Sequence, residues 1–261
     1  MNEYLDFAID IANYAGRVMK KYFFDDNLDI EYKSDNTPVT LADKTINSYL
    51  IEKVKEKYPT HGVCGEEEKY NEDREYLWVC DPLDGTSMFT RHIPVSVFSL
   101  ALVIDGNPVV GVVYDPYLDE MYTAIKGQGA FCNNKRISVD NKKYGDIGCT
   151  IDLCMWNGSK YDTLEVLKQI RKEVKLSQIG SVARACMAVA SGKISGEIFP
   201  GTSHCNCDIA ASKLIVEEAG GMVTDFHGNN QRYDVDIDGA ILTNGKIHDT
   251  VLKKVECSYR G

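Results

Sequence analysis

Apolar residues recur at helical spacing near the start of the chain, and they predict an amphipathic helix over residues 4–23. The positions that share one face are Leu5, Ile9, Ala12, Met19 and Phe23. A polar stretch follows. A second helix is expected to begin at Thr40, because Asp43 stands three residues later, as in a capping box, and one apolar face continues towards Pro59.

The pattern changes to runs of β-branched residues in the middle of the chain. Strands are expected at residues 77–80, 95–104, 109–115 and 121–125. Two of them are joined by Asp-Gly-Asn-Pro at residues 105–108, which reads as a hairpin. This part of the chain therefore predicts an antiparallel sheet.

Helices and strands alternate in the rest of the chain, which is typical of α/β folds. Helices are expected at residues 163–172, 181–191 and 208–219 and near the end, and strands at 175–179, 193–199, 222–225 and 239–244. The sequence contains no internal repeat and no obvious linker. We expect residues 1–145 and 146–261 to pack as one unit, with a soft boundary at residues 141–148.

Composition and charge narrow the classes of function. The 261 residues are 44% hydrophobic and 26% charged, as in ordinary globular proteins. The net charge of -10 and the lack of a Lys/Arg-rich run argue against binding of a nucleic acid polymer or an anionic membrane. The start is acidic, and no apolar run reaches ~18 residues, so we expect a cytoplasmic protein.

The nine cysteines are an odd number, and several stand in apolar runs, which favours buried thiols over a disulfide framework. His204, Cys205 and Cys207 lie close together in the sequence. Zinc sites usually add a second, distant cysteine pair, and the sequence has none. We therefore expect no zinc site there.

The strongest candidate chemistry lies where the strand at residues 77–80 ends. It runs into Asp81 and Asp84, whose carboxylates repel each other unless a proton or a cation intervenes. Pro82 cannot continue a central strand, so we expect the chain to turn there. A carboxylate on such a turn can bridge two cations roughly 3.5–4 Å apart, as in two-metal phosphoryl transfer.

Two further features support this interpretation. If a helix begins at Gly85 and Thr86, their amides form an anion site at its N-terminus. Glu66, Glu67 and Glu68 stand in a loop after the second helix; alone, such a run is usually a solvated turn. Together with the aspartates it makes an oxygen-rich set that suits Mg²⁺ or Mn²⁺.

Two alternative motifs fail on spacing. Aspartyl-phosphate phosphatases have one residue between their two aspartates, whereas two residues separate Asp81 from Asp84. Residues 234–239 open like an EF-hand loop, but Gly245 stands where that loop needs a bidentate glutamate. We interpret residues 234–239 as a polar turn.

At this point the chain resembles the inositol monophosphatase family of Mg²⁺-dependent phosphomonoesterases. The resemblance rests on WVCDPLDGTSMF at residues 78–89 and on residues 207–221, with GEEE, KSDNTPVTLAD and YDPYLDEMYTAIKGQGAF matching in order. It implies a mixed α/β fold, a layered αβαβα sandwich of the sugar-phosphatase type. It also implies a homodimer, and two to three Mg²⁺ ions, with Mn²⁺ as a possible substitute.

The resemblance also implies a set of metal ligands. Glu66, Asp81 and the backbone carbonyl of Leu83 would ligate one ion. Asp84 and Asp208 would join Asp81 around a second, and Glu66 with waters would hold a weaker third. Asp208 is independently plausible, because a carboxylate at a helix N-terminus is favoured by the helix dipole.

In the family's mechanism, as the resemblance implies it, Thr86 is held by Asp43 and activates a water together with Glu66. A metal-bound water attacks phosphorus in line while the second ion stabilises the leaving alkoxide. The implied substrate contacts are Lys33, Gly85, Thr86 and Ser181. Simpler structural roles are open for three of these residues: a helix cap for Asp43, a solvated lysine for Lys33 and close helix packing for Ser181.

Departures from the family pattern leave the substrate open. Met88 stands where the family often has asparagine, Cys207 where it has tryptophan, and residues 199–207 lack the usual inositol-contacting acid. We expect hydrolysis of a small phosphorylated polyol or sugar, such as inositol monophosphate. The alternatives are 3′(2′),5′-bisphosphate nucleotidase, fructose-1,6-bisphosphatase and histidinol-phosphatase activity. A non-catalytic phosphate-ligand binder is the alternative from another class.

Overall fold

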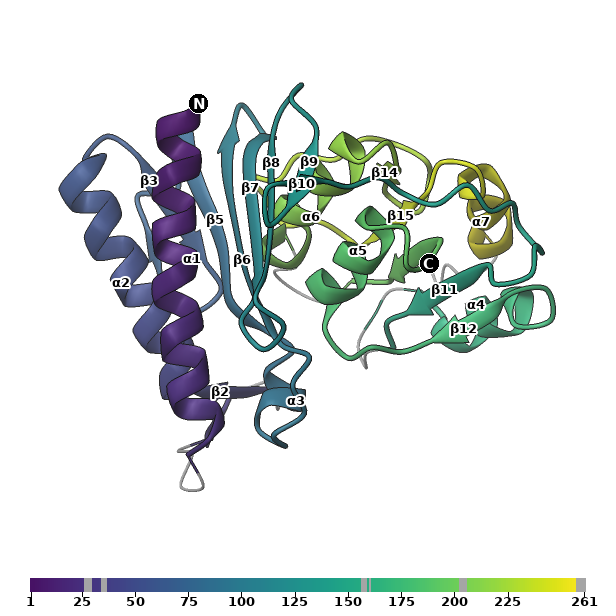
Figure 1. Cartoon of the computed structure of the whole chain (residues 1–261), viewed down its shortest axis with the longest axis horizontal. Helices are drawn as coiled ribbons and strands as arrows, with labels where there is room; N and C mark the ends of the chain where they lie inside the picture. The colour runs from purple at the N-terminus through teal and green to yellow at the C-terminus, as the bar shows by residue number, and fades with distance from the viewer. Residues whose placement is uncertain (26–29, 34–36, 156–158, 160, 202–205, 257–261) are drawn as a thin grey trace.

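The computed structural model describes residues 1–25, 30–33, 37–155, 159, 161–201 and 206–256. Helices and sheets alternate along its longest axis (Figure 1). The outermost layer holds α1 (Asn2–Phe23) and α2 (Leu41–Lys57), whose buried faces pack on one large sheet. Both helices confirm the expected apolar periodicity, and α1 begins two residues earlier than expected.

The large sheet has eight strands in the order β10-β9-β8-β7-β6-β5-β3-β4. Their bounds are β3 (Gly62–Gly65), β4 (Lys69–Tyr70), β5 (Tyr76–Asp84), β6 (Val97–Ile104), β7 (Asn107–Asp115), β8 (Glu120–Ile125), β9 (Ala130–Cys132) and β10 (Lys135–Arg136). All neighbours are antiparallel except β3 and β5, which are parallel. The expected hairpin joins β6 and β7, where Asp105 and Gly106 both have positive φ, as a tight primed turn requires.

The prediction that the chain turns at Pro82 was wrong. β5 continues to Asp84, and its register with β6 shifts between the pairs Asp81↔Ser99 and Asp84↔Val97. One extra residue on β5 therefore makes a bulge, where a proline is tolerated because the ladder is already interrupted. On the other side β3 pairs only as far as Cys80, so no ladder bond to β3 is lost.

A second sheet has five strands in the order β12-β11-β13-β15-β14. These are β11 (Thr150–Leu153), β12 (Lys175–Ser177), β13 (Gly196–Phe199), β14 (Met222–Thr224) and β15 (Ala240–Thr243). The pairs β12–β11 and β11–β13 are parallel, whereas β15 pairs antiparallel with both β13 and β14. A small separate sheet joins β1 (Ile30–Tyr32) and β2 (Pro38–Thr40).

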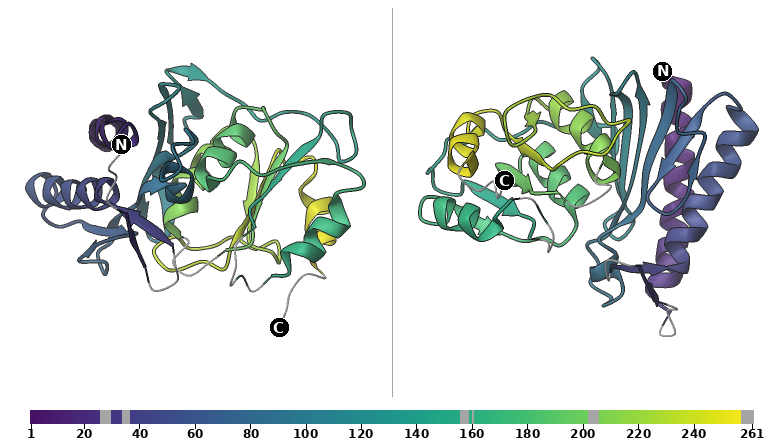
Figure 2. Two further views of the ribbon diagram at one scale, coloured as in Figure 1. Left: turned by 90° about the horizontal axis from the view of Figure 1, so that it is seen from below. Right: turned by 180° about the vertical axis from the view of Figure 1, so that it is seen from behind.

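The remaining helices complete the layers. Two of them, α5 (Val182–Ala190) and α6 (Asn206–Glu218), lie between the sheets, while α4 (Thr163–Ile170) and α7 (His248–Val255) cover the outer face of the second sheet (Figure 2). Three hydrophobic cores lie between the five layers, and one of them surrounds α5 and α6 on both faces. The expected mixed α/β, αβαβα sandwich is confirmed. In the described part of the chain, no helix is long and apolar enough to cross a membrane.

Candidate metal centre

Three aspartates from two elements converge where β5 meets α6. Asp81 and Asp84 end β5, and Asp208 lies in the first turn of α6, which packs against β5. One carboxylate oxygen from each lies within 4.8 Å of the others. The structure thus brings together three of the residues predicted to ligate metal, although Asp208 is distant from the other two in the sequence.

The bulge in β5 orients this cluster. The amide of Leu83 donates to Oδ1 of Asp81 at 2.9 Å, which fixes that carboxylate. The carbonyl of Leu83 accepts a hydrogen bond of 2.9 Å from the hydroxyl of Thr86. The carboxylate of Asp81 and the carbonyl of Leu83, both predicted to ligate metal, therefore lie in the same β-bulge.

Asp84 is held by the N-terminus of α5. Its Oδ2 accepts from the hydroxyl of Ser181 at 2.5 Å and from the amide of Ala183 at 2.6 Å. Ser181 is also the N-cap of α5, since its hydroxyl accepts from the amide of Arg184. These hydrogen bonds connect an aspartate of the large sheet to a helix that packs on the second sheet. The dipole of α5 favours a negative charge at this position.

The three carboxyl groups are electrostatically strained without a cation. Burial raises the pKa of Asp84 to about 6, although its hydrogen bonds with Ser181 and Ala183 lower it. Burial and the neighbouring carboxylates raise the pKa of Asp81 and of Asp208 well above the usual range. Groups of this kind are neutralised either by protons or by a bound cation.

Asp43 caps α2 and also contacts Thr86. Its Oδ2 accepts from the amide of Thr40 at 2.8 Å and from the hydroxyl of Thr40 at 2.6 Å, which confirms the capping box. Its Oδ1 accepts from the hydroxyl of Thr86 at 3.3 Å. Burial raises the pKa of Asp43 to about 7, while the hydrogen bonds from Thr40 lower it.

Glu66 lies at the exposed side of the centre, paired with Lys33. Nζ of Lys33 is 2.8 Å from Oε1 of Glu66 and 2.6 Å from Oε1 of Glu67. Burial alone would lower the pKa of Lys33, but the two glutamates raise it. Glu66 is outside the three-carboxylate group, yet its charge raises the pKa of Asp81 and Asp208.

Asn47 also shapes the site, and our sequence analysis missed it. It is fully buried, and its Oδ1 accepts from the amides of Glu67 and Glu68 at 3.2 and 3.3 Å, while its Nδ2 donates to the carbonyl of Glu68. A Cβ on Gly65 would lie 2.1 Å from Oδ1 of Asn47, so glycine is required beside it. The sequence does contain a hint of this role, because Asn47 is a polar residue on the predicted buried face of the helix, one turn after Asp43.

The expected helix start after Asp84 is present as a single turn, α3 (Thr86–Phe89). Gly85 has φ 89°, and a Cβ there would lie 3.0 Å from Cβ of Ser181. Only glycine adopts this conformation in this space without strain. The amides in the first turn of a helix have no intrahelical acceptor, which leaves them available for an anion.

A cavity of about 240 Å³ adjoins the centre through Ser181. Ser87 and Met88 of α3 line one side of it, and Asp152 and Glu197 of the second sheet line another. Met88, one of the departures from the family pattern, therefore borders the space next to the carboxylates.

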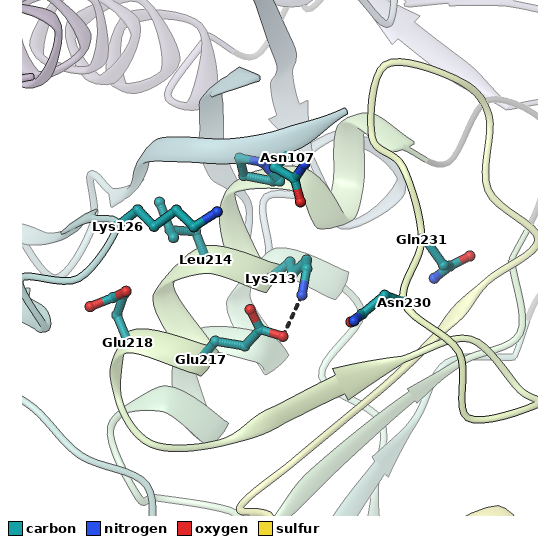
Figure 3. A pocket seen from close by; sticks show the side chains of 9 residues that line it. Asn107, Lys126, Lys213, Leu214, Glu217, Glu218, Asn230 and Gln231 are labelled. Carbon is teal, nitrogen blue, oxygen red and sulfur yellow. Dashed lines mark hydrogen bonds and ion pairs between the residues drawn. The ribbon is translucent and has the colours of Figure 1, made fainter. Parts of the chain in front are cut away.

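A second cavity, of about 250 Å³, lies further along α6 (Figure 3). Lys213 and Glu217 form an ion pair in it. Glu217 is nine residues beyond Asp208 on the same helix, or roughly 14 Å along its axis. This cavity is separate from the carboxylate cluster.

The described residues of the alternative metal motifs make other contacts. Sγ of Cys207 donates to the carbonyl of Cys64 at 3.5 Å, while His204 and Cys205 lie outside the described residues. The seven described cysteines form no disulfide. In the EF-hand-like segment, Ile237 is buried and Val235 exposed, as in the expected polar turn.

Known proteins are similar to this chain over nearly its whole length. The profile of the inositol monophosphatase family matches residues 1–260. The chain belongs to this family. Among its relatives, inositol monophosphatase 2 of Solanum lycopersicum is 33% identical over 267 residues, covering 97% of both chains. Nus factor SuhB of Pasteurella multocida is 36% identical over 241 residues, covering 88% of both.

Solved structures show the same fold over nearly the whole chain. A Thermotoga maritima IMPase superposes with a TM-score of 0.87 at 29% identity, covering 97% of both chains. The suhB protein of Bartonella henselae reaches 0.89 at 29% identity, covering 97% of this chain and 98% of that one. Membership of the inositol monophosphatase family makes this protein an enzyme, a metal-dependent phosphomonoesterase.

Proposed function

We propose that the protein hydrolyses a small phosphorylated polyol or sugar with Mg²⁺ held by Asp81, Asp84 and Asp208. The observation that carries this proposal is the convergence of one oxygen from each of the three carboxylates within 4.8 Å. The donor set fits the ion, since Mg²⁺ prefers carboxylates, carbonyls, waters and phosphate oxygens. Mn²⁺ accepts the same ligands and is expected to substitute.

Glu66 and the carbonyl of Leu83 are proposed to complete the site, for two to three ions in total. Leu83 lies in the bulge between Asp81 and Asp84, which supports a carbonyl ligand there. Glu66 is held at the exposed side by Lys33, so a metal ion would compete with Lys33 for this carboxylate. Mg²⁺ in such a site would make a bound water more acidic and neutralise charge on the phosphate.

The hydroxyl of Thr86 is proposed to orient the attacking water, together with Glu66. This hydroxyl carries one hydrogen and has two acceptors in reach, the carbonyl of Leu83 at 2.9 Å and Oδ1 of Asp43 at 3.3 Å. If the Leu83 carbonyl ligates an ion, the hydrogen turns to Asp43 and a lone pair of Thr86 accepts from the water. Asp43 is buried and fixed by Thr40, which supports its role in holding Thr86.

The substrate contacts are also proposals. The amides of Gly85 and Thr86 would receive the phosphate, and Lys33 adds positive charge at the exposed side of the site. Ser181 borders the cavity next to Asp84, so the leaving alcohol would extend past it towards Ser87. Relatives named inositol monophosphatase support an inositol monophosphate-like substrate.

The nucleotidase, fructose-1,6-bisphosphatase and histidinol-phosphatase activities are kept as alternatives. A panel of phosphomonoesters, assayed for phosphate release with Mg²⁺ and with EDTA, tests the proposal. We expect release from at least one small ester, and we expect EDTA to abolish it.

Asp84→Asn should lower this activity at least ~100-fold, because it removes a ligand charge, while the amide oxygen still accepts from α5. Asp10→Asn, an exposed change on α1, is the matched control and should leave activity unchanged. Near-normal activity in Asp84→Asn would contradict the ligand assignment.

A further inference from the structure

The cavity beside the metal centre has a buried carboxyl group in its inner wall. Glu197 on β13 borders the cavity and is 0% exposed. Among the described residues, no amide, hydroxyl or cationic side chain donates to its oxygens, and its one side-chain interaction is with the carboxyl group of Asp152. A buried carboxyl pair without a cation costs free energy, so such a pair in a native protein can be stabilised by a cationic partner that the chain itself does not supply.

A second carboxylate stands directly beside it. Asp152 on β11 is the cross-strand neighbour of Glu197 in the parallel pair and is 2% exposed. Among the described amide, hydroxyl and cationic donors, only the amide of Ile179 donates to its oxygens. Burial, the charge of Asp152 and a hydrogen bond with Asp152 raise the pKa of Glu197 well above the usual range, so the two carboxyl groups can share a proton.

The rest of the cavity wall does not neutralise this pair. Met88, Met155 and Val182 make part of it apolar. Arg91 also borders the cavity, but it is exposed and donates to the carbonyl of Ser87, one turn away on its own segment. Within the described residues, neither Glu197 nor Asp152 forms a salt bridge.

The position of the cavity connects this pair to the reaction. Ser181, whose hydroxyl donates to the proposed ligand Asp84, lines the cavity. Ser87 and Met88 follow immediately after Gly85 and Thr86, the proposed phosphate contacts. An alcohol leaving from a phosphate bound at those amides therefore has this cavity next to it.

We propose that the Glu197–Asp152 pair selects phosphomonoesters whose leaving alcohol carries a protonated amine. An ammonium group supplies hydrogen-bond donors and a positive charge to the carboxyl pair, which forms no salt bridge within the described residues. A hydroxyl group would supply a donor without the charge. The apolar wall suits the methylene chain between the phosphate and the amine.

This inference rests on the proposed phosphatase function and is tested with paired substrates. The esters are 2-aminoethyl, 3-aminopropyl and 4-aminobutyl phosphate. Each is compared with the phosphate ester of the same carbon chain that carries a terminal hydroxyl group in place of the amine, called the hydroxyl ester below. A charge-assisted hydrogen bond is worth ~1.5–3 kcal/mol, so at the best chain length kcat/KM should favour the amine by at least about tenfold.

Glu197→Gln should reduce this preference to less than about threefold, because kcat/KM falls further for the amine esters than for the hydroxyl esters. The variant should fold, because the new amide can donate to Asp152. Asp152→Asn should reduce the preference in the same direction. Glu52→Gln, an exposed change on α2, is the matched control and should keep the preference.

Equal rates for both ester series in the wild-type protein would overturn the inference while leaving the phosphatase proposal intact. An equal loss for both series in Glu197→Gln would also overturn it, since that result indicates a structural role. Saturation-transfer NMR with 3-aminopropan-1-ol tests the cavity without turnover. Binding to the wild type that is lost in Glu197→Gln supports the inference even if no ester is hydrolysed, and equal signals in both proteins contradict it.

Discussion

Asp81 shows the conflict between stability and function at a single residue. It is buried beside Asp84 and Asp208, and their mutual repulsion raises its pKa. A raised carboxyl pKa means that the folded state loses stability as pH rises from about 4 upward. In the metal-free protein at neutral pH, this side chain therefore favours unfolding.

Replacing Asp81 with Asn should stabilise the metal-free protein. The amide oxygen can still accept from Leu83, while one repelling charge is lost. A gain of about 1 kcal/mol corresponds to a rise of about 2–4 °C in the midpoint of thermal unfolding. The same variant should lose the further rise that Mg²⁺ gives the wild type. A Mg²⁺-induced rise as large as in the wild type would show that Asp81 is not a ligand.

Some of the site could be predicted residue by residue and some could not. Asp43 was recognisable because a capping box is a local pattern, and Asp81 and Asp84 because their charges lie close in the sequence. Asn47 holds backbone amides of a loop twenty residues away, and the sequence does not show which loop packs against which helix. The pairing of Glu197 with Asp152 depends on the register of two strands in a sheet interior, which no local pattern reveals.

At the scale of the element, the cap of α2 links helix stability to the site. Thr40 and Asp43 satisfy the helix N-terminus, and Asp43 also holds Thr86. Thr40→Ala should destabilise the protein by about 1 kcal/mol, as loss of an N-cap does. It should also lower kcat, because one hydrogen bond to Asp43 is lost.

Thr45→Ala provides the comparison for Thr40→Ala, measured by thermal unfolding and steady-state kinetics. Thr45 lies in the same helix, and its hydroxyl donates to the carbonyl of Leu41, outside the capping box. It should leave kcat unchanged. Identical effects of the two substitutions on kcat would argue against a link between the cap and catalysis.

The strand boundaries show where element prediction failed. Pro82 indicated a break, since proline removes a ladder bond, but a β-bulge places it where the ladder is already interrupted. The parallel pairing of β3 with β5 was also absent from the expectation, because no strand was expected at β3. The chain passes from β3 to β4 on one side of it and then crosses to β5 on the other side. Periodicity identifies a strand without identifying its neighbour.

At the scale of the whole molecule, the centre is assembled by packing between layers. The bulge of β5 belongs to the large sheet, whereas Asp208 and the N-terminus of α5 come from the helical layer between the sheets (Figure 1). The α/β class followed from the alternation of elements, and the five layers followed from the family resemblance. Their mutual contacts, which place the carboxylates together, required the structure.

Metal binding should depend on pH through these contacts. The raised pKa values, about 6 for Asp84, mean that protons occupy the site as pH falls. A cation must displace those protons, so its affinity weakens on acidification. At higher pH, adding the cation should restore the folding stability that repulsion among the three carboxylates removes.

The central claim is that Asp81, Asp84 and Asp208 hold a divalent cation, and calorimetric titration with Mn²⁺ tests it most directly. The wild type should bind Mn²⁺ at pH 8, bind it at least ~10-fold more weakly at pH 5.5, and lose one site in Asp208→Asn. Unchanged binding in Asp208→Asn, or no binding by the wild type, would contradict the claim.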